Sequence, residues 1–166
     1  MLNEQEITSY QQNGYIVPSD FHLAPDETNA LRADLEKVPE QNPDIPSERL
    51  INPHLDGKLP YGGIGVAGFD RLARDTHILD IVEQVIGSDL ILWLTHLFCK
   101  PVGTGREVPW HQDSQYWPIE PAATCTVWLA LDKVDQENCV MRVIPGAHKN
   151  STYSHSTDLS PKLTLN

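Results

Sequence analysis

The sequence predicts a single α+β domain spanning residues 1–166. Two observations support this class. The first half contains stretches with apolar residues at helical spacing, whereas the second half contains short segments rich in β-branched and aromatic residues, separated by turn-forming residues. A chain in which helices precede strands usually packs the helices on one side of a sheet or barrel. We therefore expect a helical part over residues 1–88 and a β-rich part over residues 89–166.

The first helix is predicted from the signals at its two ends. Asn3 is a residue type that favours the N-cap position. A helix that starts there would end at Asn13–Gly14, because glycine suits the left-handed position that follows a helix. Residues 15–17 are β-forming, and they predict a short strand after this turn.

The second helix begins at Pro25, because proline is favoured at the first helical position. Its apolar residues recur at intervals of four and three, which is the helical period, and are Leu31, Leu35 and Val38. Residues 39–65 then form a long irregular segment, and loops of this length are usually functional. His54 lies in it. A lone loop histidine is more often solvated than ligating, so His54 is not assigned to a site.

A third helix is predicted from Asp70 to Gly87, where glycine ends it. Beyond it, β-branched and aromatic content predicts four strands. Four strands leave unpaired edges that a sandwich or barrel would have to close, and no closing element follows them in the sequence. We therefore expect the β-rich part to be incomplete at its C-terminus. The four predicted strands cover residues 90–100, 107–113, 124–131 and 140–144.

Charge, cysteine spacing and hydropathy argue against several kinds of partner and site. The formal net charge is −11, from 12 lysines and arginines against 23 aspartates and glutamates, which argues against nucleic-acid and anionic-membrane partners. The 3 cysteines are widely spaced without a Cys-x-x-Cys pair, so a zinc knuckle or thioredoxin-like site is not expected. The N-terminal residues do not resemble a signal peptide, and the longest apolar stretch is too short to span a bilayer. We expect a cytoplasmic protein.

His111 and Asp113 are candidate metal ligands within a predicted strand. Residues two apart in a strand project to the same face, with Cα atoms about 6.5 Å apart. An imidazole nitrogen and a carboxylate oxygen could both bind one divalent ion, and two histidines with one carboxylate suit a non-haem iron(II) oxygenase. The same spacing also fits a solvated surface strand. The neighbouring Trp110, Tyr116 and Trp117 argue against that alternative, because exposed tryptophans are uncommon.

Five motifs, in this order and spacing, closely resemble the phytanoyl-CoA dioxygenase family. They are Lys100-Pro101-Val102-Gly103, Trp110-His111-Gln112-Asp113, Tyr116-Trp117-Pro118, Val127-Trp128-Leu129-Ala130-Leu131-Asp132 and Met141-Arg142-Val143-Ile144-Pro145-Gly146-Ala147-His148. Residues 13–17 and the helix around Leu31 also look like the N-terminal region of that family. The resemblance thus covers nearly the whole chain.

The resemblance implies a double-stranded β-helix (jelly-roll) core with N-terminal helices. It also implies oxidation of a small-molecule substrate by dioxygen, with iron(II) as cofactor and 2-oxoglutarate as cosubstrate. His111 and Asp113 match the proximal metal ligands, and Lys100 and Trp128 match residues that line the 2-oxoglutarate pocket. Thr126, on the same predicted face as Trp128, is a further cosubstrate candidate. Lys100 could instead be a solvated charge at a strand end, and Trp128 a core residue.

The chain also departs from the family pattern. The family's second metal histidine, and the arginine that binds the far carboxylate of 2-oxoglutarate, lie well downstream of the turn that ends at His148. We therefore expect this chain to carry only the proximal half of the site.

Gln112 should point away from the metal by strand alternation. Cys139 stands where the family commonly has glycine, and a positive φ there would strain it by roughly 1–2 kcal/mol.

Three functions remain open from the sequence. The first is an iron(II)/2-oxoglutarate-dependent dioxygenase that hydroxylates a small organic molecule. The second is a catalytically inactive jelly-roll fragment or binding module. The third is a zinc hydrolase that uses His111, Asp113 and either His148 or His155. Neither the substrate nor the oligomeric state is predicted.

Overall fold

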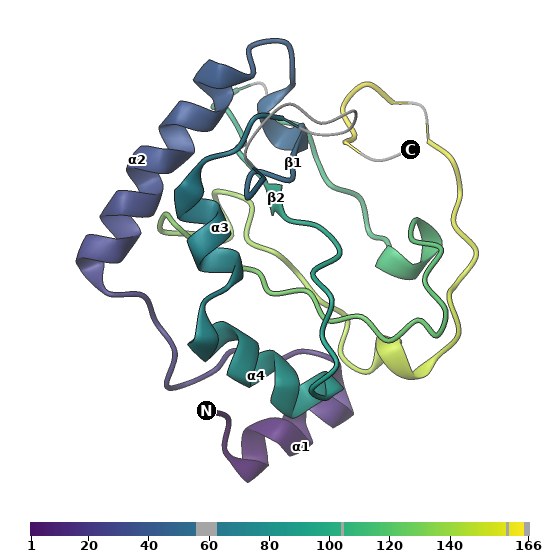
Figure 1. Cartoon of the computed structure of the whole chain (residues 1–166). Coiled ribbons are helices and arrows are strands. Elements are labelled where there is room, and N and C mark those ends of the chain that lie inside the picture. The colour runs from purple at the N-terminus through teal and green to yellow at the C-terminus, as the bar shows by residue number, and fades with distance from the viewer. Residues whose placement is uncertain (56–62, 104, 159, 165–166) are drawn as a thin grey trace. The chain divides into compact units, whose positions relative to one another are not determined.

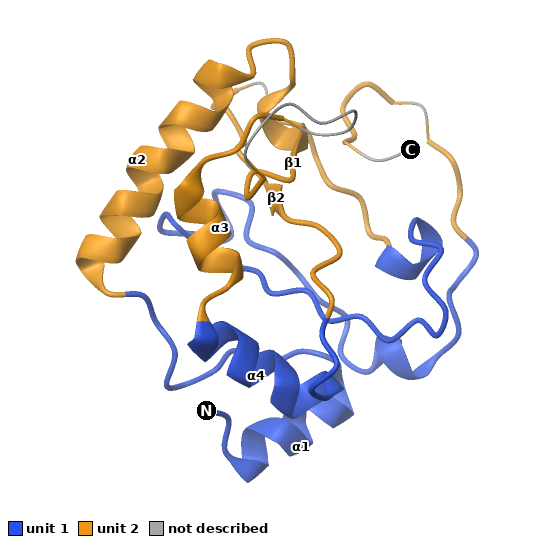
Figure 2. Ribbon diagram, in the orientation of Figure 1, with its two compact units in different colours: residues 1–23, 76–90, 112–154 blue, residues 24–75, 91–111, 155–166 orange. Residues whose placement is uncertain are grey.

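The computed structural model describes residues 1–55, 63–103, 105–158 and 160–164. The chain divides into two compact units, each built from segments that are distant in the sequence (Figure 2). The first unit comprises residues 1–23, 76–90 and 112–154. The second unit comprises residues 24–75, 91–111 and 155–166.

The first unit contains helices α1 (Glu4–Asn13) and α4 (Thr76–Ile86), which contact each other (Figure 1). The side chain of Asn3 accepts the N–H of Glu6 at 2.9 Å, and the Glu6 carboxylate accepts the N–H of Asn3 at 2.9 Å. This capping box satisfies two backbone donors that a helix start leaves without partners. Gly14 ends α1 at φ 79°, and Gly87 follows α4 at φ 95°. The predicted start and end of α1 and the predicted C-terminal end of α4 are confirmed.

The C-terminal end of α1 is held by residues 145–148, which we call the Pro-Gly-Ala-His turn. The N–H of Gly146 donates to the carbonyl of Asn13 at 2.8 Å. The Nε2 of His148 lies 3.1 Å from the carbonyl of Gln11 and, facing an acceptor, carries the proton. A Cβ on Gly14 would lie only 2.3 Å from Nδ1 of His148. The turn therefore supplies donors to carbonyls at the helix end and needs glycine at position 14.

The second unit contains helices α2 (Pro25–Gln41) and α3 (Ala67–Ala73), which contact each other. Pro25 starts α2 as predicted, but the helix continues past Pro39 to Gln41. Asn42 closes it: the side-chain amide donates to the carbonyls of Val38 at 2.6 Å and Ile64 at 2.9 Å, and its oxygen accepts the N–H of Ile64 at 2.7 Å. The buried apolar side chains of this unit are Leu31, Val38, Leu50 and Phe69.

The helix predicted over residues 70–87 is two helices in the structure. The N–H of Arg74 donates to the carbonyls of Asp70 and Arg71, each at 3.2 Å, and ends α3 in a tight turn. Asp75, a residue type that favours N-cap positions, then precedes α4. No helix in the described ranges combines the length and the hydropathy that a membrane crossing requires.

Paired β structure is much smaller than predicted. Strands β1 (Leu50–Ile51) and β2 (His96–Leu97) form an antiparallel pair, with Leu50 opposite Leu97, and Glu107 makes an isolated parallel bridge to Leu163. Elsewhere in the described ranges no strand forms, so the prediction for residues 90–100 holds only at β2. A β-forming composition shows only that a segment can join a sheet, whereas a strand also needs a partner. The jelly-roll core therefore stays a prediction. Strand predictions that are wrong here are those for residues 15–17, 107–113, 124–131 and 140–144.

Cys139 adopts the left-handed conformation, with φ 75°, at the position where the sequence suggested strain. It lies in a turn in which the N–H of Val140 donates to the carbonyl of Asp135 at 3.0 Å. We expect Cys139→Gly to raise the free energy of unfolding by about 0.5–1 kcal/mol, because relief of the steric strain exceeds the entropy that glycine loses. Chemical denaturation measures this change. Cys139→Ala is the control, since it removes the thiol and keeps the Cβ, and an equal gain there would contradict the explanation.

Glu48 provides a pH-dependent contribution to stability in the second unit. It lies in the 3-10 helix η1 (Ser47–Arg49), is 7% exposed, and forms an ion pair with Arg106. The hydrogen bond from Arg106 holds the pKa of this carboxyl below its ordinary value. A lowered pKa contributes stability that is present above the unfolded value of about 4.3 and is lost as the pH falls through the folded value.

We therefore expect the free energy of unfolding to fall as the pH is lowered below about 4.3. Glu48→Gln should make this fall shallower, because the substituted side chain no longer takes up a proton. Urea denaturation between neutral and acidic pH checks the slope. The matched control is Glu40→Gln, at an exposed position near the end of α2. Equal slopes in both variants would exclude Glu48 as the source.

Candidate metal centre

His111 has one ring nitrogen bonded to a backbone carbonyl, an arrangement that suits a metal ligand. It is half-buried in the second unit, four residues after the bridge at Glu107. Its Nδ1 lies 2.7 Å from the carbonyl of Pro109. A carbonyl only accepts, so Nδ1 carries a proton, and in the neutral ring Nε2 is the nitrogen with the lone pair. A hydrogen bond from one ring nitrogen to a backbone carbonyl is a common way of fixing a metal-binding histidine.

Asp113 is held from both its backbone and its side chain in the first unit. It is the first residue of the 3-10 helix η2 (Asp113–Gln115), and its carbonyl accepts the N–H of Tyr116 at 2.9 Å and of Trp117 at 3.2 Å. Its carboxylate oxygen Oδ2 accepts the hydroxyl of Thr126 at 3.1 Å. An oriented carboxylate of this kind is a suitable ligand for a divalent ion.

The backbone around these two residues differs from the predicted strand. Gln112 is extended, with φ −121° and ψ 131°, but the chain turns at Asp113. Strand alternation over residues 107–113 was the argument for placing both ligands on one face, and that argument does not extend to Asp113. The division between the two units falls between His111 and Gln112, so each ligand is described within its own unit.

Thr126 contacts the candidate ligand Asp113, a contact that the sequence did not suggest. The neighbouring Cys125 connects this segment to α1, because its side chain forms a hydrogen bond with the hydroxyl of Tyr10. Burial raises the pKa of Tyr10 to about 12 and also raises the pKa of Cys125, so both groups are neutral near pH 7. The carboxylate of Asp113 thus lies beside a hydroxyl on a segment that is itself held to α1.

We expect Thr126→Val to weaken divalent-metal binding by about tenfold, the lower end of the usual cost of removing a partner that orients a ligand. The substitution keeps the shape of the side chain and removes the hydroxyl that bonds to Asp113. Thr126→Ser retains the hydroxyl and should bind metal like the unchanged chain. Calorimetric titration with Co(II) measures both affinities. Equal losses in the two variants would show that the methyl group, not the hydrogen bond, matters.

Lys100 and Trp128 lie in different units, and each is described by itself. Lys100 is half-exposed in the second unit and precedes a turn at Gly103, where φ is 79°. Trp128 is in the first unit, two residues beyond Thr126, with 42% of its surface exposed. That exposure is too large for a core residue, which was the structural alternative for Trp128.

His148, one of the candidates for a zinc ligand, takes part in the anchoring of α1. Its Nε2 contacts the carbonyl of Gln11, and its ring covers Gly14. His155, the other candidate, is half-buried in the second unit. Within the described residues, no group of three or more histidine, cysteine, aspartate or glutamate side chains is arranged to hold a metal ion.

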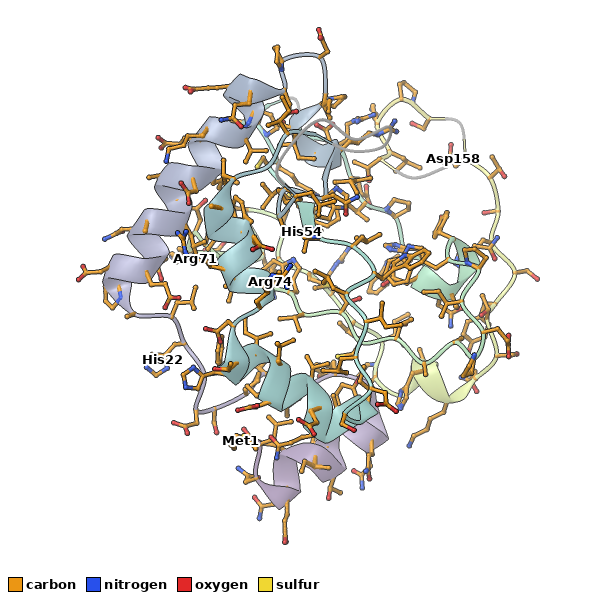
Figure 3. All side chains as sticks on the ribbon, in the orientation of Figure 1. Met1, His22, His54, Arg71, Arg74 and Asp158 are labelled. Atoms are coloured by element: carbon orange, nitrogen blue, oxygen red, sulfur yellow. The ribbon has the colours of Figure 1, made fainter. Side chains whose placement is uncertain are left out.

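His54, which the sequence left unassigned, lines a surface hollow of about 490 Å³ together with Leu55, Ala67 and Asp70. Its Nδ1 is 2.6 Å from the hydroxyl of Thr95, and burial lowers its pKa. Figure 3 labels His54 and Arg74. The Nε of Arg74 lies 2.9 Å from a carboxylate oxygen of Asp70. A tertiary contact to Thr95 is what distinguishes His54 from a solvated histidine, and its local sequence carries no signal of that contact.

Comparison with known proteins identifies related sequences. The family profile described as "Phytanoyl-CoA dioxygenase (PhyH)" matches residues 10–165. A probable phytanoyl-CoA dioxygenase of Caenorhabditis elegans is 25% identical over 93% of this chain and 55% of its own length. A probable alpha-ketoglutarate-dependent hypophosphite dioxygenase of Stutzerimonas stutzeri is 31% identical over 64% of this chain and 34% of its own length.

An ectoine dioxygenase of Nocardia farcinica is 25% identical over 89% of this chain and 52% of its own length. The chain thus spans about half the length, or less, of these curated relatives. No solved structure is significantly similar to it.

Proposed function

This chain belongs to the phytanoyl-CoA dioxygenase family, and on that premise we propose that it carries the proximal half of the active site of an iron(II)/2-oxoglutarate-dependent dioxygenase. The named relatives are dioxygenases for different small molecules, namely phytanoyl-CoA, hypophosphite and ectoine. A small-molecule substrate and dioxygen are therefore the proposed reactants. The relatives' names differ too much to select one compound.

The observation that carries the proposal is the tautomer of His111. Protonation of Nδ1, which donates to Pro109, leaves Nε2 as the nitrogen that can bind a metal. Asp113 adds a carboxylate oriented by Thr126. One residue with extended backbone, Gln112, lies between the two ligands in the sequence. A neutral imidazole and a carboxylate suit iron(II), so the residues present fit the cofactor that the family implies.

In the proposed reaction, iron(II) with 2-oxoglutarate and dioxygen supplies the oxidation, which converts the oxo acid to succinate and carbon dioxide and places one oxygen atom in the substrate. The protein contributes ligation, orientation and exclusion of water. Lys100 is proposed to pair with a carboxylate of 2-oxoglutarate, and Trp128 to form an apolar wall of its pocket. Thr126 is proposed to orient Asp113. A cosubstrate contact for its hydroxyl, suggested by the sequence, stays a prediction.

The jelly-roll core and the cytoplasmic location belong to the same proposal. Support for the core comes from the family match over residues 10–165. The location stays a prediction from the acidic composition of the chain.

Anaerobic titration tests the proposal. We expect the purified chain to bind iron(II), and addition of 2-oxoglutarate to produce the weak visible absorption band of an iron(II)–2-oxo acid complex. Addition of dioxygen should then yield succinate. Zinc(II) in place of iron(II) is the control, since it cannot give the band. No iron binding at all would contradict the proposal.

A second candidate is a binding module without catalysis. Metal binding without the visible band and without succinate would select this candidate. A zinc hydrolase that uses His148 is disfavoured, because that ring is bonded to Gln11 and packed over Gly14. Metal affinity that is unchanged in His148→Ala and His155→Ala would exclude it.

A further inference from the structure

Gln112 and Ser114 flank the candidate ligand Asp113, and both are bonded to one later segment of the first unit. The side-chain oxygen of Gln112 accepts the N–H of Tyr153 at 2.7 Å. The hydroxyl of Ser114 lies 2.7 Å from the hydroxyl of Thr152. Two consecutive residues, 152 and 153, thus hold the residues on either side of Asp113. We call these four residues the Asp113 bracket.

The bracket and the carboxylate of Asp113 contact different segments. Gln112 and Ser114 bond to residues 152–153, whereas Asp113 bonds to Thr126. Three hydrogen bonds from three consecutive residues therefore fix both the position and the rotation of this short stretch of backbone. A single bond would leave it free to pivot.

The segment that supplies the bracket is itself anchored. It follows the 3-10 helix η3 (Ala147–Lys149), which overlaps the Pro-Gly-Ala-His turn, and Gly146 of that turn bonds to Asn13 of α1. The side-chain amide of Asn150 also donates to the hydroxyl of Tyr153 at 2.7 Å. Figure 1 shows this stretch running from η3 past η2. Residues 152–153 can thus serve as a fixed support for η2.

We propose that Gln112 and Ser114 are positioning residues, which hold Asp113 in the orientation that binds the metal. The inference rests on the proposed function, because it assumes that Asp113 is a ligand. Partners outside the ligand set usually change metal affinity by about 10–100-fold. On this proposal Gln112 does more than separate His111 and Asp113 in the sequence, because its side chain holds the backbone next to Asp113 in place.

Titration of the full chain with Co(II), a stand-in for iron(II), is the first measurement. We expect Gln112→Ala and Ser114→Ala each to lower the affinity about tenfold. Ser114→Thr keeps the hydroxyl beside Thr152 and should restore the unchanged affinity. Gln115→Ala is the matched control, since Gln115 is an exposed glutamine of η2 whose side chain makes no described contact.

Amide hydrogen exchange on the metal-free chain is the second measurement, and it needs no bound metal. Gln112→Ala should speed exchange at the N–H of Tyr153 several-fold and leave α4 unchanged, which separates loss of the bracket from unfolding. Unchanged exchange at Tyr153 would overturn the inference. So would Gln112→Ala and Ser114→Ala variants that bind Co(II) as tightly as the original chain. An original chain that binds neither Co(II) nor iron(II) would instead contradict the proposed function, and the positioning role with it.

Discussion

Replacing Asp113 with asparagine is expected to weaken iron(II) binding by more than about a hundredfold, since loss of the partners that orient a ligand already costs 10–100-fold. The substitution preserves the size of the side chain and an oxygen that can accept the hydroxyl of Thr126. It removes the negative charge with which the carboxylate attracts the divalent cation. Anaerobic calorimetric titration of the two proteins measures the loss.

The control for the charge is Asp89→Asn, which removes one negative charge at an exposed position in the same unit. It should bind iron(II) as the original chain does. His111→Ala should be as damaging as Asp113→Asn, because the two residues are proposed to share one ion. An Asp113→Asn protein with unchanged affinity would remove Asp113 from the ligand set.

Gly14→Ala is expected to lower the free energy of unfolding by about 2–5 kcal/mol, which is a large share of the stability of a small domain. Two costs combine in this estimate. A left-handed residue with a Cβ costs about 1–2 kcal/mol, and overlap within a packed contact costs about 1–3 kcal/mol. The overlap arises because the new Cβ would lie 2.3 Å from the ring of His148. Urea denaturation followed by circular dichroism measures the sum.

Gly87→Ala separates these two costs. Gly87 also follows a helix at positive φ, but no atom lies within 4 Å of the position that its Cβ would occupy. This variant should therefore show only the conformational cost, about 1–2 kcal/mol. Addition of His148→Ala to Gly14→Ala should cost less than His148→Ala alone, because the pair is coupled. Equal losses at both glycines would exclude the overlap with His148.

The helix ends were predictable because their signals are local. The Asn3 side chain and the Gly14 backbone act within one helical turn, so a short stretch of sequence contains the whole interaction. Pro25 is similar. The break between α3 and α4 was missed because neither glycine nor proline stands there. Asp75, a good N-cap residue, was the available signal.

The strands were poorly predicted because their partners are not local. Residues 124–131 and 140–144 have the β-branched content of strands, but the described residues place no strand beside them. Within residues 90–100, all of which are described, only His96–Leu97 pair, with a strand about 45 residues earlier, and nothing in the composition of this segment selects those two positions.

At the candidate site, the sequence identified the candidate ligands but not the groups that hydrogen-bond to them and to their neighbours. His111 and Asp113 were selected from spacing and from the surrounding motifs. The carbonyl of Pro109 that fixes the tautomer is only two residues away, yet its direction depends on the local backbone. The bracket joins residues about 40 positions apart, so no local pattern contains it.

The hydrogen bond between His148 and Gln11 also affects the order in which parts of the chain can fold during synthesis. The two residues are 137 positions apart, so at about 5–20 residues per second the ribosome adds the second roughly 7–27 s after the first. An isolated helix of 10 residues is marginal in water over that interval. Contact with α4 becomes available earlier, but the C-terminal end of α1 waits for the Pro-Gly-Ala-His turn to leave the ribosome. Helix α1 is thus completed only after residues 145–148 have been synthesised, well after its own residues.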